Sequence, residues 1–94
     1  MRIEWLPIAA RTRESQLAYI SDRNPWAAID LGDAVDAAVK NLVHHPHMGR
    51  LGRIKGTREL VVSGTPYVIA YRVEPDAVVI LRPLRGAQRW PAKL

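Results

Sequence analysis

One stretch of the chain repeats apolar residues at steps of three and four positions, the period of an α-helix that is buried along one face. The repeating residues are Ala28, Leu31, Val35, Ala38, Val39 and Leu42. Just before them stand Asn24, a good helix N-cap, and Pro25, which suits the first helical turn. Pro46 disfavours continuation, so we expect the helix to end near His44–His45. A long helix with one apolar face needs a second layer to pack against.

Three runs of strand-forming residues in the second half of the chain predict that layer. They are Arg58–Val62, Tyr67–Val73 and Val78–Leu84. Residues 63–66 and 74–76 separate them and are rich in Gly, Pro, Ser and Asp, which are turn-forming residues. Because these connections are short, the strands are expected to form an antiparallel meander.

The first part of the chain predicts one more strand and one more helix. Arg2–Leu6 has the alternation of a short strand, and Pro7 suits the start of a helix running to about Arg23. That helix is only weakly amphipathic, since Arg13 and Gln16 lie where apolar residues would help. The element order β-α-α-β-β-β predicts an α+β fold, in which an N-terminal strand and a helical hairpin pack on one curved antiparallel sheet. Residues 1–94 are expected to form a single domain.

The composition narrows the class of protein. The hydrophobic share of 48% is that of a globular chain, and no apolar run approaches the roughly 18 residues of a membrane span. The first residues do not have the pattern of a signal peptide. There is no cysteine, which excludes disulfides and thiolate chemistry. These features predict a cytoplasmic protein without a membrane partner.

Positive charge is concentrated in the second half of the chain. Residues 1–48 carry six acids and five cations, whereas residues 49–94 carry three acids and nine cations. The cations of interest are Arg50, Arg53, Lys55, Arg58, Arg72, Arg82, Arg85 and Arg89. Antiparallel pairing could bring them together on one sheet face or rim, as a surface for nucleic acid or for an acidic protein. The alternative is that they pair with Glu59, Glu74 and Asp76 and only solvate the sheet.

Two further clusters each admit more than one chemistry. His44, His45 and His47 invite a metal interpretation, but Pro46 interrupts the helical spacing that ligands favour, and helix C-termini simply favour His. We therefore expect no metal and no cofactor. Trp90, close to Arg85 and Arg89, suits a protein-binding hot spot or base stacking, and equally a packing role.

Several segments, taken in order and with their spacing, are similar to those of a known family. They are AYI (18–20), NPWAA (24–28), NLVHHPHMGR (41–50), GTRELVV (56–62), PYVIAYRV (66–73) and ILRPL (80–84). Over nearly its whole length the chain resembles the RelE/ParE superfamily of type II toxin–antitoxin toxins, and its long helical hairpin resembles the ParE branch. The resemblance implies growth inhibition or plasmid stabilisation, and a cognate antitoxin that neutralises the toxin. It also implies a helical hairpin on an antiparallel sheet.

The resemblance leaves the target open between two activities. ParE-like members inhibit DNA gyrase without catalysis, whereas RelE-like members cleave mRNA on the ribosome. Where RelE-like toxins often carry an Arg and a Leu-His pair, this chain has Val68 and the pair Leu84-Arg85. Losing an Arg and a His weakens the nuclease hypothesis. If the chain is a nuclease, the substitute catalytic residues are Lys55, Arg82 and Arg85.

Two expectations about partners follow. An acidic, partly disordered antitoxin segment should lie across the hairpin and the sheet, with its carboxylates on the arginines. The residues expected to bind the antitoxin or the target are Arg50, Arg53, Arg58, Arg72, Arg82, Arg85, Arg89 and Trp90. A third possibility is a degenerate toxin, which is inactive and serves only as an antitoxin-binding module.

Overall fold

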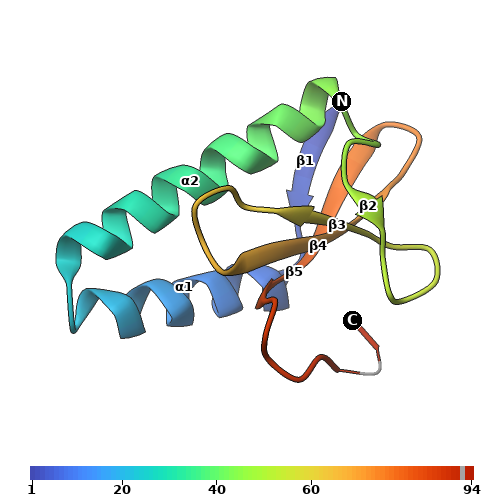
Figure 1. The fold of residues 1–94 in the computed structure, drawn as a ribbon. Coiled ribbons are helices and arrows are strands. Elements are labelled where there is room, and N and C mark those ends of the chain that lie inside the picture. The colour runs from blue at the N-terminus through green and yellow to red at the C-terminus, as the bar shows by residue number, and fades with distance from the viewer. Residues whose placement is uncertain (92) are drawn as a thin grey trace.

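Helix α2 (Pro25–His44) forms as its sequence predicts. The Asn24 side chain accepts a hydrogen bond from the Ala27 amide at 3.2 Å, and the predicted apolar face is buried, with Ala38 at its half-buried edge. The computed structural model describes residues 1–91 and 93–94. The remaining elements are β1 (Arg2–Trp5), α1 (Pro7–Ser21), β2 (Arg50–Leu51), β3 (Arg58–Val61), β4 (Tyr67–Val73) and β5 (Ala77–Arg85). Figure 1 shows the two helices joined as a hairpin on one side of the sheet.

The sheet has five strands in the order β1-β5-β4-β3-β2. The predicted meander of β3, β4 and β5 is antiparallel, so the α+β fold is confirmed, and the predicted element order holds except for one added strand, β2. The sheet as a whole is mixed, however, because β1 pairs in parallel with β5. This pairing gives hydrogen-bond partners to the backbone groups along the free edge of β5. It also places Ile3 opposite Val78 and Trp5 opposite Ile80, on the side of the sheet that faces the helices.

A further difference concerns the segment of residues 50–55, for which the sequence predicts no strand. Its first two residues form β2, which pairs antiparallel with β3 and ends the sheet. A strand of two residues is too short to produce a readable alternation of apolar and polar positions. Residues 52–57 then form the loop between β2 and β3.

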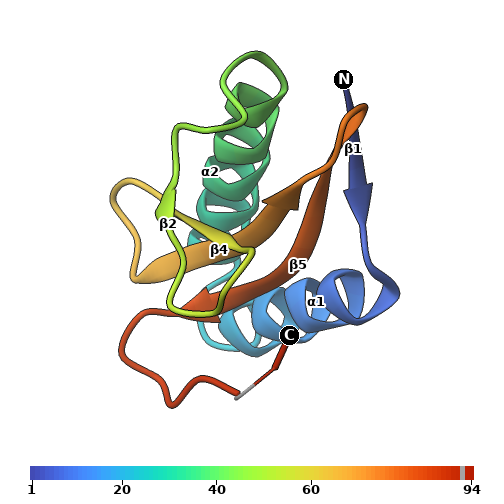
Figure 2. The same ribbon diagram turned by 90° about the vertical axis from the view of Figure 1, so that its right-hand side faces the viewer.

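The core lies between the hairpin and the helix-facing side of the sheet. Leu42 of α2, Ile69 and Tyr71 of β4, and Ile80 of β5 are all fully buried there. Alternation along β4 therefore assigns Val68, Ala70 and Arg72 to the other side of the sheet. This side is here called the open face because neither helix covers it (Figure 1), although Val68 and Ala70 are buried. Figure 2 shows the sheet lying in front of α2.

The two polar residues that weaken the apolar pattern of α1 hold that helix in place. An Arg13 guanidinium nitrogen lies 2.9 Å from an Asp36 carboxylate oxygen on α2, and the Arg13 guanidinium lies 5.8 Å from the centre of the Trp5 ring. The Gln16 amide donates a hydrogen bond to the Pro83 carbonyl at 3.0 Å. Helix α1 is thus attached to α2 and to β5 partly through polar contacts.

The turn after α2 is fixed by a buried tyrosine. The Tyr71 hydroxyl accepts a hydrogen bond from the Gly49 amide at 3.0 Å and donates one to the Pro46 carbonyl at 2.8 Å. A side chain at Gly49 would place its Cβ 2.8 Å from the Glu59 carbonyl oxygen, so only glycine fits. The pKa of Tyr71 is raised, mainly because the side chain is buried. The hydroxyl therefore stays protonated and can donate its hydrogen bond.

Candidate functional site

The predicted basic residues separate according to the face of the sheet that they occupy. Arg50, Arg72 and Arg82 stand in register with Glu59, Val79 and Ala70, all on the open face. Arg58 and Arg85 stand opposite Tyr71 and Tyr67, on the side of the helices. The predicted series therefore does not gather on a single face.

A buried carboxylate organises the open face. Glu59 is only 3% exposed, and one of its oxygens accepts hydrogen bonds from Arg50 at 2.9 and 3.2 Å. Its other oxygen accepts from the Arg53 amide at 2.8 Å and from the Arg53 guanidinium at 3.2 Å. Burial by itself would raise the pKa of Glu59, but these hydrogen bonds and the nearby positive charge outweigh it, so the pKa lies below its ordinary value. Glu59 stays ionised and ties the β2–β3 loop to the sheet.

The C-terminal segment joins this network. The Arg53 guanidinium lies 3.5 Å from the centre of the Trp90 ring, a cation–π contact. The Trp90 indole donates a hydrogen bond to the Arg85 carbonyl at 3.3 Å. Trp90 is half-buried, and in Figure 2 the C-terminal segment turns back from the end of β5. Trp90 therefore has the packing role that its sequence position left open.

The remaining predicted cations differ in their partners. Arg72 pairs with Glu74 at 2.6 Å, and Arg58 donates to the Gly49 carbonyl at 2.8 Å, where it supports the turn after α2. Half-buried Arg82 forms no ion pair in the part of the chain that the structure describes, and its Nε has no hydrogen-bond partner there. Lys55 and Arg89 are exposed, in the β2–β3 loop and in the C-terminal segment.

The three residues named for a nuclease are divided among separate places. Arg82 lies on the open face, Arg85 faces the helices and Lys55 is in a loop. Residues three apart in a strand point to opposite faces, so Arg82 and Arg85 do not share one site.

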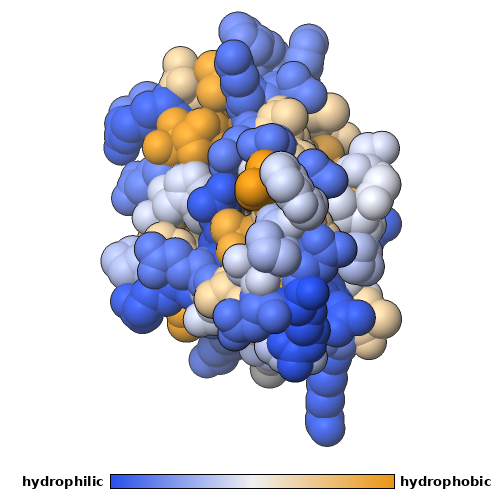
Figure 3. All heavy atoms as spheres, turned by 90° about the vertical axis from the view of Figure 1, so that its left-hand side faces the viewer, coloured by the Kyte–Doolittle hydropathy of each residue, from blue (hydrophilic) through white to orange (hydrophobic). Residues whose placement is uncertain are grey.

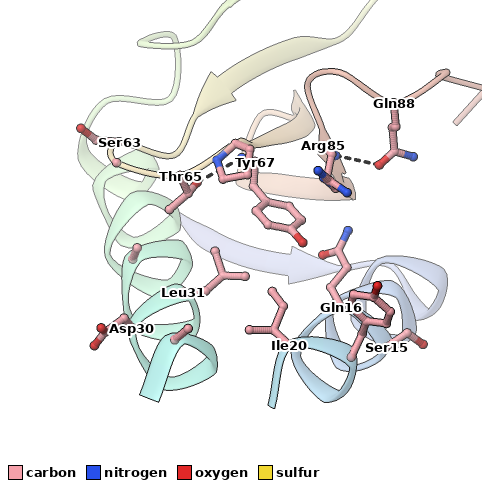
Figure 4. Close-up of a pocket in the computed structure, with 15 residues that line it drawn as sticks. Ser15, Gln16, Ile20, Asp30, Leu31, Ser63, Thr65, Tyr67, Arg85 and Gln88 are labelled. Atoms are coloured by element: carbon pink, nitrogen blue, oxygen red, sulfur yellow. Dashed lines mark hydrogen bonds between the residues drawn. The ribbon is translucent and has the colours of Figure 1, made fainter. Parts of the chain in front are cut away.

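A groove lies between the hairpin and the turn that joins β3 to β4. It encloses about 840 Å³, and its lining includes Ile20, Ala27, Leu31, Pro66, Tyr67 and Arg85. Figure 4 shows the Arg85 side chain beside Gln16 at one end of the groove, and Asp30 on the far side. The Arg85 amide donates to the Gln88 side chain at 2.8 Å, but the Arg85 guanidinium forms no ion pair within residues 1–91 and 93–94.

The sequence indicated the walls of this groove but not the groove itself. Gly64, with φ of +78°, allows the β3–β4 turn, and the turn was predicted from its residue types. The space arises because the hairpin stands away from this turn, a distance that no local pattern encodes. Apolar side chains along the groove and a cation at one end suit a peptide segment with apolar anchors and a carboxylate.

Within residues 1–91 and 93–94, no three His, Asp or Glu side chains gather closely enough to hold a metal ion. Among the helices of the same residues, none combines the length and apolarity that crossing a membrane requires.

Comparison with known proteins places this geometry in a family. Residues 3–90 match the sequence model of the ParE toxin of the type II toxin–antitoxin system parDE. The protein named "Putative toxin Y4kP" of Sinorhizobium fredii (strain NBRC 101917 / NGR234) is 42% identical over 93 residues, which cover 99% of this chain and 96% of that protein. Toxin RelE3 of Caulobacter vibrioides (strain ATCC 19089 / CIP 103742 / CB 15) is 35% identical over 89 residues, 93% of this chain and 96% of that toxin.

The fold comparison agrees. A solved chain from the chromosomal ParDE toxin–antitoxin system of P. aeruginosa superposes with a TM-score of 0.80 at 25% identity, covering 90% of this chain and 95% of that one. The resemblance to RelE/ParE toxins, and to the ParE branch in particular, is thereby confirmed. The chain, with its helical hairpin on a mixed sheet, belongs to the ParE family of type II toxin–antitoxin toxins.

Proposed function

We propose that this chain is a growth-inhibiting cytoplasmic toxin, that its antitoxin neutralises it by filling the groove between the hairpin and the β3–β4 turn, and that its target is DNA gyrase. The observation that carries the antitoxin site is the groove itself. The groove is lined by the apolar side chains of Ile20, Leu31 and Tyr67 and by the guanidinium of Arg85. Among the described residues, no carboxylate pairs with Arg85.

The chemistry of the groove fits an acidic segment that orders on binding. Its apolar residues would occupy the space above Tyr67, and a carboxylate would meet Arg85 in a charge-assisted hydrogen bond. Net charge of +5 on the toxin would also speed the encounter with an acidic partner. The association rate should therefore fall as the salt concentration rises.

Gyrase is proposed as the target because Lys55, Arg82 and Arg85, the residues named for a nuclease, do not share one site. Arg50 and Arg53 are tied to Glu59, and Arg82 and Arg85 lie on opposite faces of the sheet. A ribosome-dependent mRNA endonuclease is the second candidate. Arg82, with an unbonded Nε on the open face, and the 35% identity to Toxin RelE3 favour it.

Three measurements separate these activities. The chain is expressed alone and together with the product of the neighbouring reading frame, and growth is followed. The purified toxin is then added to a gyrase supercoiling assay and, in parallel, to a translation assay in which mRNA ends are mapped. We expect growth arrest, rescue by the antitoxin, and inhibited supercoiling with intact mRNA. Codon-phased mRNA cuts that disappear with Arg82→Ala would replace gyrase by the ribosome, and normal growth with soluble toxin would indicate an inactive antitoxin-binding module.

A further inference from the structure

The outer surface of α2 carries large apolar side chains that the fold does not use. Trp26 is 77% exposed and Ile29 is 55% exposed, and both lie in the first turns of the helix. Positions three apart share one side of a helix, so the two side chains are neighbours. Figure 3 faces this end of the molecule and shows orange and pale side chains among the blue ones. An exposed Trp beside an exposed Ile on a small soluble domain indicates a contact surface.

Carboxylates line the same surface. Asp30 and Asp33 continue the series i, i+4, i+7 from Trp26, so the four residues form one outward stripe along α2, here called the α2 stripe. Asp30 and Asp33 take part in no ion pair within the described residues. In a chain with a net charge of +5, the α2 stripe is thus a local acidic and apolar surface.

The start of α2 is held firmly where Trp26 projects. Asn24 caps the helix, and its own amide donates to the Ile20 carbonyl at 2.7 Å. Arg23 donates to the Tyr19 carbonyl at 2.9 Å, with its guanidinium 3.7 Å from the centre of the Tyr19 ring. A rigid backbone beneath an indole lowers the entropy lost on binding, and Trp is common among the residues that dominate protein interfaces.

The α2 stripe borders the surface proposed for the antitoxin but shares only Asp30 with it. Trp26, Ile29 and Asp33 do not line the groove, whereas Asp30 does. The free carboxylates of the α2 stripe would repel the phosphates of a nucleic acid. Charge complementarity instead favours a protein with Lys and Arg around an apolar pocket. Enzymes that handle DNA carry such basic surfaces.

We propose that the α2 stripe, with Trp26 at its centre, docks this toxin onto its target, a protein that presents an apolar pocket rimmed by basic residues. This inference rests on the proposed toxin function, but it does not require the target to be gyrase. It assigns the antitoxin and the target to different surfaces. A toxin with an altered stripe should therefore bind its antitoxin normally and still fail to arrest growth.

Trp26→Ser is the main test, and Leu51→Ser is the matched control. Leu51 is also 77% exposed and apolar, but it lies in β2 at the far edge of the sheet. We expect Trp26→Ser to raise the toxin level that is needed for growth arrest at least about tenfold, as substitution of a hot-spot residue would. Leu51→Ser should match the wild type, and both variants should keep the wild-type Kd for the antitoxin, which also verifies their folding. Asp33→Lys should weaken arrest in the same direction.

The contrary results separate a failure of the α2 stripe from a failure of the proposed function. Full arrest by Trp26→Ser would remove the α2 stripe from the target interface while leaving the toxin function in place. Parallel loss of antitoxin binding would make the stripe part of the antitoxin site, and a toxin dimer split by Trp26→Ser would make it a self-contact. A wild type that does not arrest growth would overturn both proposals. Growth arrest without gyrase inhibition would overturn only the proposal that gyrase is the target. The variants would still test whether the α2 stripe contacts the target.

Discussion

On the open face of the sheet, Arg50 and Arg53 share the buried carboxylate of Glu59, whereas on the helix side Arg85 reaches a groove without a carboxylate partner among the described residues. Both regions present arginine side chains, but within residues 1–91 and 93–94 an internal carboxylate pairs with the arginines in only the first of them. Arg50 and Arg53 each direct two guanidinium nitrogens at Glu59, so part of their charge is already balanced and fewer of their donors are left for a ligand. Arginine content therefore locates a basic half of the chain, while strand register decides which arginines are available to a ligand.

The largest expected effect is on the groove. Arg85→Glu should raise the Kd for the antitoxin about 100-fold, because it replaces a favourable charge contact with repulsion. Arg11→Glu is the control, since Arg11 is exposed on α1 and does not line the groove. Calorimetric titration measures both variants. An equal loss for the two would mean that only net charge matters, and that the groove has no special role.

The next effect concerns stability rather than binding. Glu59→Gln should lower the free energy of unfolding by about 2 kcal/mol, because it removes charge-assisted hydrogen bonds to Arg50 and Arg53. Glu74→Gln removes an exposed pair with Arg72 and should cost less than about 0.5 kcal/mol. Urea unfolding compares them. Equal losses of unfolding free energy in the two variants would show that the buried Glu59 network is no more stabilising than the exposed Arg72–Glu74 pair.

The same carboxylate makes stability depend on pH. The folded pKa of Glu59 is lowered, so its contribution is complete above the ordinary pKa of 4.5 and is lost as the pH falls through the folded value. The free energy of unfolding should therefore decrease on acidification below that pH, and less steeply in Glu59→Gln. Identical pH profiles for the two proteins would contradict this assignment.

The smallest effect is expected at the C-terminal segment. Trp90→Ala should lower the free energy of unfolding by about 1 kcal/mol, through loss of the contact with Arg53. Because Trp90 belongs to the open-face network, the Kd for the antitoxin should change less than about twofold. A large loss of antitoxin affinity in titration, with unchanged stability, would return Trp90 to the binding surface.

The sequence predicted the parts of the fold that local chemistry determines. Asn24 and Pro25 start α2, the turn residues separate β3, β4 and β5, and the element order gives the fold class. The parallel pairing of β1 and the short β2 depend on contacts between distant residues, which no local pattern contains.

The candidate site was less predictable, although one signal was present. Arg82 and Arg85 are three residues apart in a strand, and this spacing already places them on opposite faces. The possibility that acids would neutralise the arginines was realised at Glu59 and Glu74, while Asp76 pairs with Arg2 instead. The groove could not be predicted, since it depends on how the hairpin packs beside the β3–β4 turn.

Amide hydrogen exchange of the toxin, alone and bound to its antitoxin, tests the central claim most directly. We expect binding to slow exchange in the β3–β4 turn at residues 63–66, which borders the groove, and to leave exchange in the β2–β3 loop at residues 52–57 unchanged. Protection of the β2–β3 loop without protection of the β3–β4 turn would place the antitoxin on the open face and contradict the account.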